Sequence, residues 1–173
     1  MKKFVLLSAI LVATVAFGAA SWDITGGSWN ESLQAWDIVQ GATVTLTLSD
    51  DATINGGGMS FVGTIEDGDY VDGSFTDIKT PMFSNSSVAQ VGESIEVSYD
   101  STVGFGVEPG DVFSIDFIAN APLATEQGGA YSITSSGSWA TSNPADVGYN
   151  VVPEPMTMAL LGLGGLFVRR RSA

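Results

Sequence analysis

Carboxylates and tryptophans are the residue types through which this sequence could do chemistry. The 173 residues include nineteen Asp and Glu and four Trp, but no His and no Cys. The chain therefore lacks the commonest general base, the commonest transition-metal ligand, and the Ser-His and Cys-His nucleophile arrangements. The enzyme chemistry that remains is a carboxylate pair acting on a glycoside, and nothing in the spacing selects two carboxylates for it. We predict a protein without enzymatic activity.

The densest group of carboxylates lies in the segment 66–73, which reads Glu-Asp-Gly-Asp-Tyr-Val-Asp-Gly. Ca²⁺ prefers oxygen ligands, which makes Asp67, Asp69 and Asp72 candidate metal ligands. The spacing departs from that of an EF-hand loop, because Val71 occupies the place of an alternate ligand. We favour a solvated hairpin turn here. Calcium is the one cofactor that the sequence leaves open.

Tryptophans recur at intervals of seven residues near the start of the chain, and a fourth lies far along it. Exposed aromatic rings can stack on sugar rings. The candidate ligand-stacking residues are Trp22, Trp29, Trp36 and Trp139. Gly26 and Gly27 prevent one continuous strand from carrying the first two. We favour core packing or covering of a sheet edge for these rings, with a sugar platform as the alternative.

Charge is distributed unevenly along the chain. Eighteen of the nineteen acidic residues lie between Asp23 and Asp146, whereas every basic residue except Lys79 lies near a terminus. Such an acidic middle repels nucleic-acid phosphates, so we exclude nucleic acid as a partner. It favours solubility in a salty exterior. Without cysteine, a fold outside the cytoplasm must be held by its core and not by disulfides.

Alternation of apolar and polar residues predicts strands throughout the middle of the chain. Val44, Leu46 and Leu48 alternate with threonines, and 94–99 and 113–117 show the same pattern. Further strands are expected at 22–29, 33–39, 59–65, 71–78, 131–134 and 147–151. Gly, Asp, Asn and Pro clusters separate these segments. We predict an all-β domain over 21–150, an antiparallel β-sandwich of about eight to ten strands.

The first twenty residues have the three-part pattern of a secretory signal peptide. Lys2 and Lys3 precede an apolar run from Phe4 to Phe17, and the small residues 18–20 follow. The run is shorter than the roughly 20 residues that a membrane-spanning anchor needs. We expect signal peptidase to remove 1–20 by cleavage after Ala20, with cleavage after Gly18 as the alternative.

The last residues present a helix breaker, an apolar run and a basic cluster in that order. Pro153, Glu154 and Pro155 precede the apolar residues 156–168, and the chain then carries the cluster Arg169, Arg170 and Arg171. A helix over 156–168 would be about 20 Å long, against a hydrocarbon core of about 30 Å. The arginines would stay in the cytoplasm, leaving the acidic middle outside. We predict a short membrane helix that first anchors the exported protein at the inner membrane.

This C-terminal pattern resembles the PEP-CTERM sorting signal of Gram-negative bacteria that make extracellular polysaccharide. The resemblance covers 152–173, so we assign 151–173 to a sorting signal. It implies recognition by an exosortase that cuts near Pro153 to Pro155, with Arg169 to Arg171 as the cytoplasmic basic anchor. The mature protein would then reach the cell envelope, the cell surface or the extracellular matrix. An ordinary tail anchor is the alternative.

Two stretches of the middle distantly resemble cohesin-like or carbohydrate-binding-module-like sandwiches: Val44 to Ile65, and Gly110 to Phe117 with its Gly-Asp-led apolar strand. This resemblance implies a β-sandwich and assigns no binding residue. We predict an exported, non-enzymatic envelope or matrix protein. The alternative is a binding module, assisted or not by calcium, for extracellular polysaccharide or another envelope protein.

Overall fold

The computed structural model describes residues 19–53, 59–78, 85–101, 108–120, 131–138 and 142–154. These residues form twelve strands and no helix, so none of them belongs to a helix that could cross a membrane. Residues 1–18 of the predicted signal peptide, Trp139, Lys79, and everything from Pro155 onward lie outside the described residues, whereas Ala19 is described and Ala20 begins β1. The predicted helix 156–168 and the arginine cluster therefore stay predictions.

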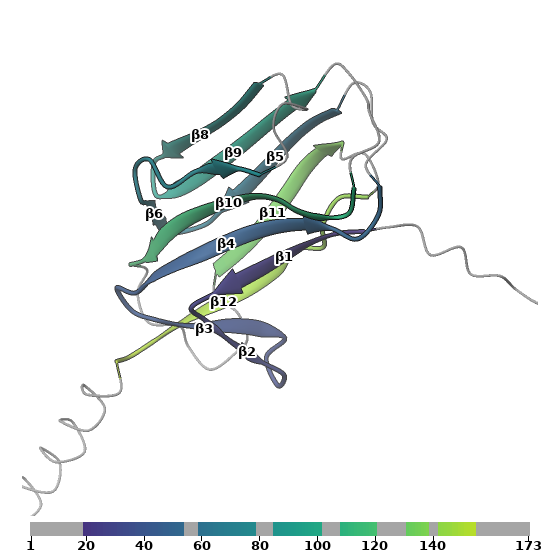
Figure 1. Cartoon of the computed structure of the whole chain (residues 1–173). Helices are drawn as coiled ribbons and strands as arrows, with labels where there is room; N and C mark the ends of the chain where they lie inside the picture. Colours follow the sequence, from purple (N-terminus) through teal and green to yellow (C-terminus); the bar gives the residue numbers. More distant parts are fainter. Residues whose placement is uncertain are drawn as a thin grey trace, which may run out of the picture.

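Figure 1 shows the strands arranged as two sheets that face one another. The first sheet has the order β1-β4-β10-β6, with β7 also paired to β10. The second sheet has the order β2-β3-β12-β11-β5-β9-β8. The strands are β1 (Ala20–Thr25), β2 (Ser28–Asn30), β3 (Ala35–Val39), β4 (Thr43–Asp50), β5 (Met59–Ile65), β6 (Gly68–Tyr70), β7 (Thr76–Asp77), β8 (Asn85–Val91), β9 (Ser94–Ser101), β10 (Gly110–Ala119), β11 (Tyr131–Ser138) and β12 (Val147–Val152). The prediction of an all-β sandwich is confirmed for the described residues.

Two details of that prediction need correction. The described residues form twelve strands where we expected about eight to ten, because β2, β6 and β7 have only two or three residues each. The sandwich is also not wholly antiparallel, since β12 runs parallel to β3. These two strands come from opposite ends of the chain, so no hairpin dictates their relative direction.

The core forms where the alternating strands turn their apolar faces toward each other. In β4 the side chains of Val44, Leu46 and Leu48 are buried, as the alternation predicts. The outer face carries hydroxyl groups that bond to the neighbouring strand: Thr45 donates to Asp116 Oδ1 at 2.6 Å. The inner faces of both sheets supply the largest buried side chains, among them Phe61, Tyr99, Phe113, Phe117 and Tyr149.

Trp22 on β1 lies inside this core. Its ring centroid is 6.1 Å from that of Phe61 and 6.1 Å from that of Phe113. A Cβ at Gly63 would lie 2.9 Å from the indole, so the glycine leaves room for the ring. Trp22 is only 7% exposed, so its proposed ligand-stacking role is wrong. The interpretation that we favoured, core packing, holds for this residue.

The bend at Gly26 carries the chain from the first sheet to the second. Gly26 has a φ of 97°, which side-chain-bearing residues rarely adopt. β1 before the bend pairs with β4, and β2 after it pairs with β3. The bend therefore separates Trp22 from Trp29, and the two rings do not share one strand.

Candidate functional site

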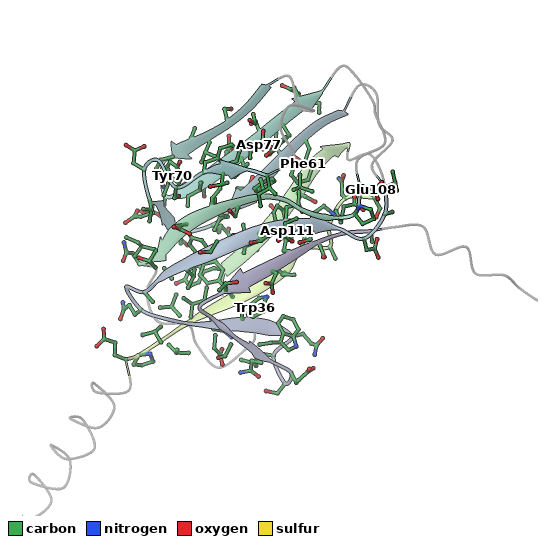
Figure 2. All side chains as sticks on the ribbon, in the orientation of Figure 1. Trp36, Phe61, Tyr70, Asp77, Glu108 and Asp111 are labelled. Atoms are coloured by element: carbon green, nitrogen blue, oxygen red, sulfur yellow. The ribbon has the colours of Figure 1, made fainter. Side chains whose placement is uncertain are left out.

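Aromatic side chains form a row across four neighbouring strands of the second sheet. The strand register places Trp29 on β2 opposite Trp36 on β3, Trp36 beside Tyr149 on β12, and Tyr149 opposite Tyr131 on β11. We call these four residues the aromatic row. Figure 2 labels Trp36, which lies toward the β2–β3 end of the molecule.

One end of the aromatic row is anchored in the core. Tyr149 is fully buried, with its ring centroid 5.9 Å from Phe117 of the first sheet and 5.3 Å from Tyr131. Its hydroxyl donates a hydrogen bond to the backbone carbonyl of Glu66. Burial raises the pKa of the Tyr149 hydroxyl above its ordinary value, with smaller contributions from nearby Asp67, Tyr131 and Glu66. The hydroxyl therefore stays protonated and serves as a donor.

The other end of the row reaches solvent. The Trp29 side chain is 40% exposed, and its ring meets Trp36 edge to face at a centroid distance of 5.5 Å. Trp36 is partly buried and packs against the core. An exposed indole whose orientation is held by a second, anchored indole presents a fixed apolar surface. Such a surface can stack on a sugar ring or accept an apolar side chain.

Polar contacts hold the β2–β3 hairpin that carries these rings. The Asn30 side-chain oxygen accepts hydrogen bonds from the Ser32 hydroxyl at 2.7 Å and from the Leu33 N–H at 3.3 Å. The Asn30 amide donates to Asp37 at 2.9 Å. Asp37 also accepts a bond from the Asn150 amide of β12 at 3.2 Å. The hairpin is thus tied both to itself and to the strand beside it.

The sequence singled out only part of this site. Trp29 and Trp36 were candidates, and the structure brings them into contact. Trp139 lies outside the described residues. Tyr131 and Tyr149 were not singled out, although each lies in a segment predicted as a strand. Cross-strand register joins the four residues, and register is not visible from local spacing.

The acidic segment 66–73 serves as a crossover between the sheets. It leads from β5 in the second sheet to β6 in the first, and Asp67 has a φ of 49°. The predicted hairpin turn is therefore wrong, since the strands on either side do not pair. The Glu66 carboxylate accepts bonds from the Ser132 N–H at 3.0 Å and hydroxyl at 2.7 Å. Asp69 accepts a bond from the Asn120 amide.

No group of three or more acidic side chains is placed to hold a metal ion in the part of the chain that the structure describes. Asp67, Asp69 and Asp72 lie in that part and form no such group. The calcium site stays a prediction without support from the geometry of these residues.

β12 is the last strand before the C-terminal segment, and it is firmly bound on both sides. It lies between β3 and β11 in the second sheet. Val151 is buried beside Ile38, and the Val152 carbonyl accepts a hydrogen bond from the Gln40 N–H at 2.9 Å. Pro153 and Glu154 follow directly, and Glu154 is exposed. The last described strand therefore ends at Val152, directly before the Pro-Glu-Pro tripeptide.

Comparison with solved structures finds similarity to cohesin modules over most of the chain. A non-cellulosomal cohesin from the archaeon Archaeoglobus fulgidus has 13% identity and a TM-score of 0.44, covering 80% of this chain and 96% of that one. The sixth cohesin of Acetivibrio cellulolyticus scaffoldin B has 12% identity and a TM-score of 0.47, covering 78% and 99%. A type I cohesin from Clostridium thermocellum has 16% identity and a TM-score of 0.41, covering 78% and 99%. No curated protein matches the chain by sequence.

The C-terminal segment matches a family directly. Residues 151–172 match the PEP-CTERM protein-sorting motif, in agreement with the resemblance that the Pro-Glu-Pro tripeptide and basic end suggested. The match begins at Val151, inside β12. The chain thus carries a sorting motif whose first two residues belong to the last described strand of the β-sandwich.

Proposed function

We propose that this protein is exported, is processed by an exosortase, and displays its acidic sandwich at the cell envelope, the cell surface or in the extracellular matrix. The observation that carries this proposal is the PEP-CTERM sorting motif at 151–172, which begins in the last two residues of β12. The protein acts without catalysis, by offering contact surfaces at the place where the motif delivers it. Signal peptidase and an exosortase are its processing partners.

The junction between β12 and the motif supports this order of events. Val151 and Val152 are held by backbone pairing with β3, so a cut at either residue would remove part of the sheet. Glu154 is exposed and belongs to no strand. A cut at or after Pro153 would leave the sandwich whole.

Replacing the three terminal arginines tests the sorting role. In the triple variant Arg169→Ser, Arg170→Ser, Arg171→Ser, we expect export to continue while retention and tail cleavage fall at least about tenfold, because the positive cluster that holds the C-terminus in the cytoplasm is lost. A pulse-chase experiment in an exosortase-containing host, with cell fractionation and mass spectrometry of the C-terminus, measures both.

The matched control is Lys79→Ser, which removes a basic residue from the middle of the chain and should leave processing unchanged. The same wild-type chain in a host without an exosortase should keep its tail. Normal tail cleavage in the arginine variant, or cleavage without an exosortase, would contradict the proposal.

A second candidate function is favoured by the exposed end of the aromatic row. Trp29 presents 40% of its surface to solvent while Trp36 fixes its orientation, which suits stacking on a sugar ring of an extracellular polysaccharide. We expect Trp29→Ala to weaken binding to purified polysaccharide fragments about tenfold or more, from the loss of an aromatic contact worth about 1.5 kcal/mol or more.

The control for that test is Ile78→Ala, because Ile78 is 45% exposed and follows β7, which belongs to the first sheet and not to the sheet that carries the row. Binding measured on a glycan array with Ca²⁺ and again with EGTA also tests whether calcium assists polysaccharide binding. Equal losses from both substitutions would remove Trp29 as a specific contact. No binding by the wild-type chain to any glycan would leave display as the function.

A further inference from the structure

β8 forms one edge of the second sheet and is the outermost strand on that side in Figure 1. It pairs with β9 without a register shift, from Asn85 opposite Asp100 to Val91 opposite Ser94. Among the described residues, no strand pairs with its other edge. Alternate residues of an antiparallel strand direct both backbone groups away from the partner. The outer edge of β8 therefore presents a ladder of N–H and C=O groups.

Edges of this kind usually carry features that prevent a further strand from adding: a charge, a proline, a bulge or a short length. β8 is seven residues long and reads Asn-Ser-Ser-Val-Ala-Gln-Val, with no charged residue and no proline. The edge strands β2, β6 and β7 have only two or three residues. The remaining long edge, β1, carries the exposed Asp23. β8 is the unprotected edge among the described strands.

We propose that β8 pairs antiparallel with β8 of a second copy of this chain, about a two-fold axis at Val88. In this register Val88 lies opposite its own copy, Ser86 opposite Gln90, and Ser87 opposite Ala89. No charged side chain enters the interface. In β1 the same arrangement would bring the two copies of Asp23 close together, where like charges are destabilising.

The acidity of the chain does not oppose this pairing. Charged side chains next to β8 include Asp77 of the first sheet, which accepts a hydrogen bond from the Ser86 hydroxyl at 3.3 Å. On β9, Asp100 lies opposite Asn85 and Glu96 opposite Ala89, and Glu96 is the closer of these two to the two-fold axis at Val88. In the paired sheet the two copies of Glu96 are separated by three strand spacings, about 14 Å. The Debye length at physiological ionic strength is about 8 Å, so their repulsion is largely screened.

The pairing fixes where the two C-terminal segments leave the dimer. β8 and β12 run in the same direction, because the four strand pairs between them are all antiparallel. An antiparallel β8 pair therefore places the two ends of β12 at opposite ends of one continuous sheet. This orientation matters only if the proposed function holds and the chains are displayed on a surface. The two C-terminal segments leave the dimer in opposite directions, so the pair would join chains on two facing surfaces and not two chains side by side on one membrane.

Single cysteine variants of the full chain in detergent test the register, since the natural chain has no cysteine. In the proposed pair the Cα atoms of the two Val88 residues lie about 4.5–5.5 Å apart, within the range of a disulfide. The two Val91 residues lie about 20 Å apart. We expect Val88→Cys to form cross-linked dimers under mild oxidation at least about tenfold faster than Val91→Cys.

Exposure alone predicts the opposite result, because Val91 is 50% exposed whereas Val88 is partly buried. Faster or equal cross-linking of Val91→Cys would overturn the proposed register. The comparison therefore separates specific pairing from random collision.

Analytical ultracentrifugation of the full chain tests the dimer itself. Ala89 is exposed on β8, and Ala89→Lys adds a charge to each copy at the interface. We expect the dimerisation constant to weaken about tenfold or more, with Ser21→Lys on β1 as the control that leaves it unchanged. A wild-type monomer at every concentration, or an equal effect of Ser21→Lys, would overturn the proposal. Tail cleavage of the wild-type chain in an exosortase-containing host, measured in parallel, reports on sorting separately. A wild-type monomer that is still processed rejects the pairing alone, and a wild-type dimer that is not processed rejects the sorting role alone.

Discussion

Ending the chain after Glu154 should change the melting temperature of the sandwich by no more than about 2 °C, whereas ending it after Asp146 should abolish cooperative unfolding. The second truncation removes β12, which lies between β3 and β11. Its loss takes the fully buried Tyr149 and the nearly buried Val151 out of the core. Loss of one large buried aromatic side chain alone costs about 3–5 kcal/mol, a large share of the stability of a typical domain.

The loss of β12 also divides the second sheet. β2 and β3 reach the rest of that sheet through the β12 pairing, so the hairpin that carries Trp29 and Trp36 would lose its attachment. Thermal melts followed by circular dichroism in the near and far ultraviolet measure both truncations. A cooperative melt of the chain ending at Asp146 would show that β12 is dispensable. A large loss of stability in the chain ending at Glu154 would show that the sorting segment contributes to the fold.

This pair of truncations also bounds the processing site. The PEP-CTERM motif begins at Val151, while the pairing of β12 continues to Val152. Under the proposed processing, the first two residues of the motif must therefore stay on the mature chain for the sandwich to keep β12 intact. Pro153 and Glu154 are the first residues of the motif that lie outside the described strands.

Strands with strict alternation could be predicted from the sequence. β4 and β10 are both buried on one face, so their apolar residues must recur at every second position for the sheet to bury them. The segments 94–99 and 113–117 lie within β9 and β10, as predicted. In these strands, burial of one face requires an apolar residue at every second position, and this alternation is what the sequence shows.

β8 could not be predicted in this way. It is an edge strand, and most of its described side chains are exposed or only partly buried, so no alternation is imposed on it. Backbone pairing with β9 holds it in the sheet. The strand predicted over 71–78 is confirmed only at Thr76 and Asp77, which form β7. Within that segment, only 71–75 connect β6 to β7. Both short strands pair with β10.

The candidate site could be predicted only in part from the sequence, because its four residues come from four strands that pair side by side in the second sheet. Trp22 and Trp29 are the same residue type seven positions apart, yet one is 7% and the other 40% exposed. The bend at Gly26 sends Trp29 to the edge of the second sheet, while Trp22 faces inward from the first. The parallel pairing of β3 with β12 then completes the aromatic row, and no local pattern encodes a pairing between strands so far apart in the chain.

Gly137→Ala should be the most damaging single glycine substitution in the second sheet. Gly137 lies in β11 opposite Phe61, with a φ of 86°. A Cβ on its backbone would lie 2.1 Å from the Ser60 carbonyl oxygen, a backbone atom that cannot move without displacing β5. Strain at an unfavourable φ costs of the order of 1–3 kcal/mol, and the clash adds to it. We expect a loss of about 3–4 kcal/mol and a melting temperature lower by about 10 °C or more.

Gly41→Ala separates the two contributions. Gly41 has a comparable φ of 75°, but a Cβ there would meet nothing within 4 Å. Its substitution should therefore cost only the backbone strain, about 1 kcal/mol, and lower the melting temperature by a few degrees. Thermal and urea unfolding of both variants provide the comparison. Equal destabilisation by the two substitutions would mean that the close approach of β11 to β5 at Ser60 does not constrain the folded chain, whereas a several-fold larger effect at Gly137 would identify that approach as the reason for glycine.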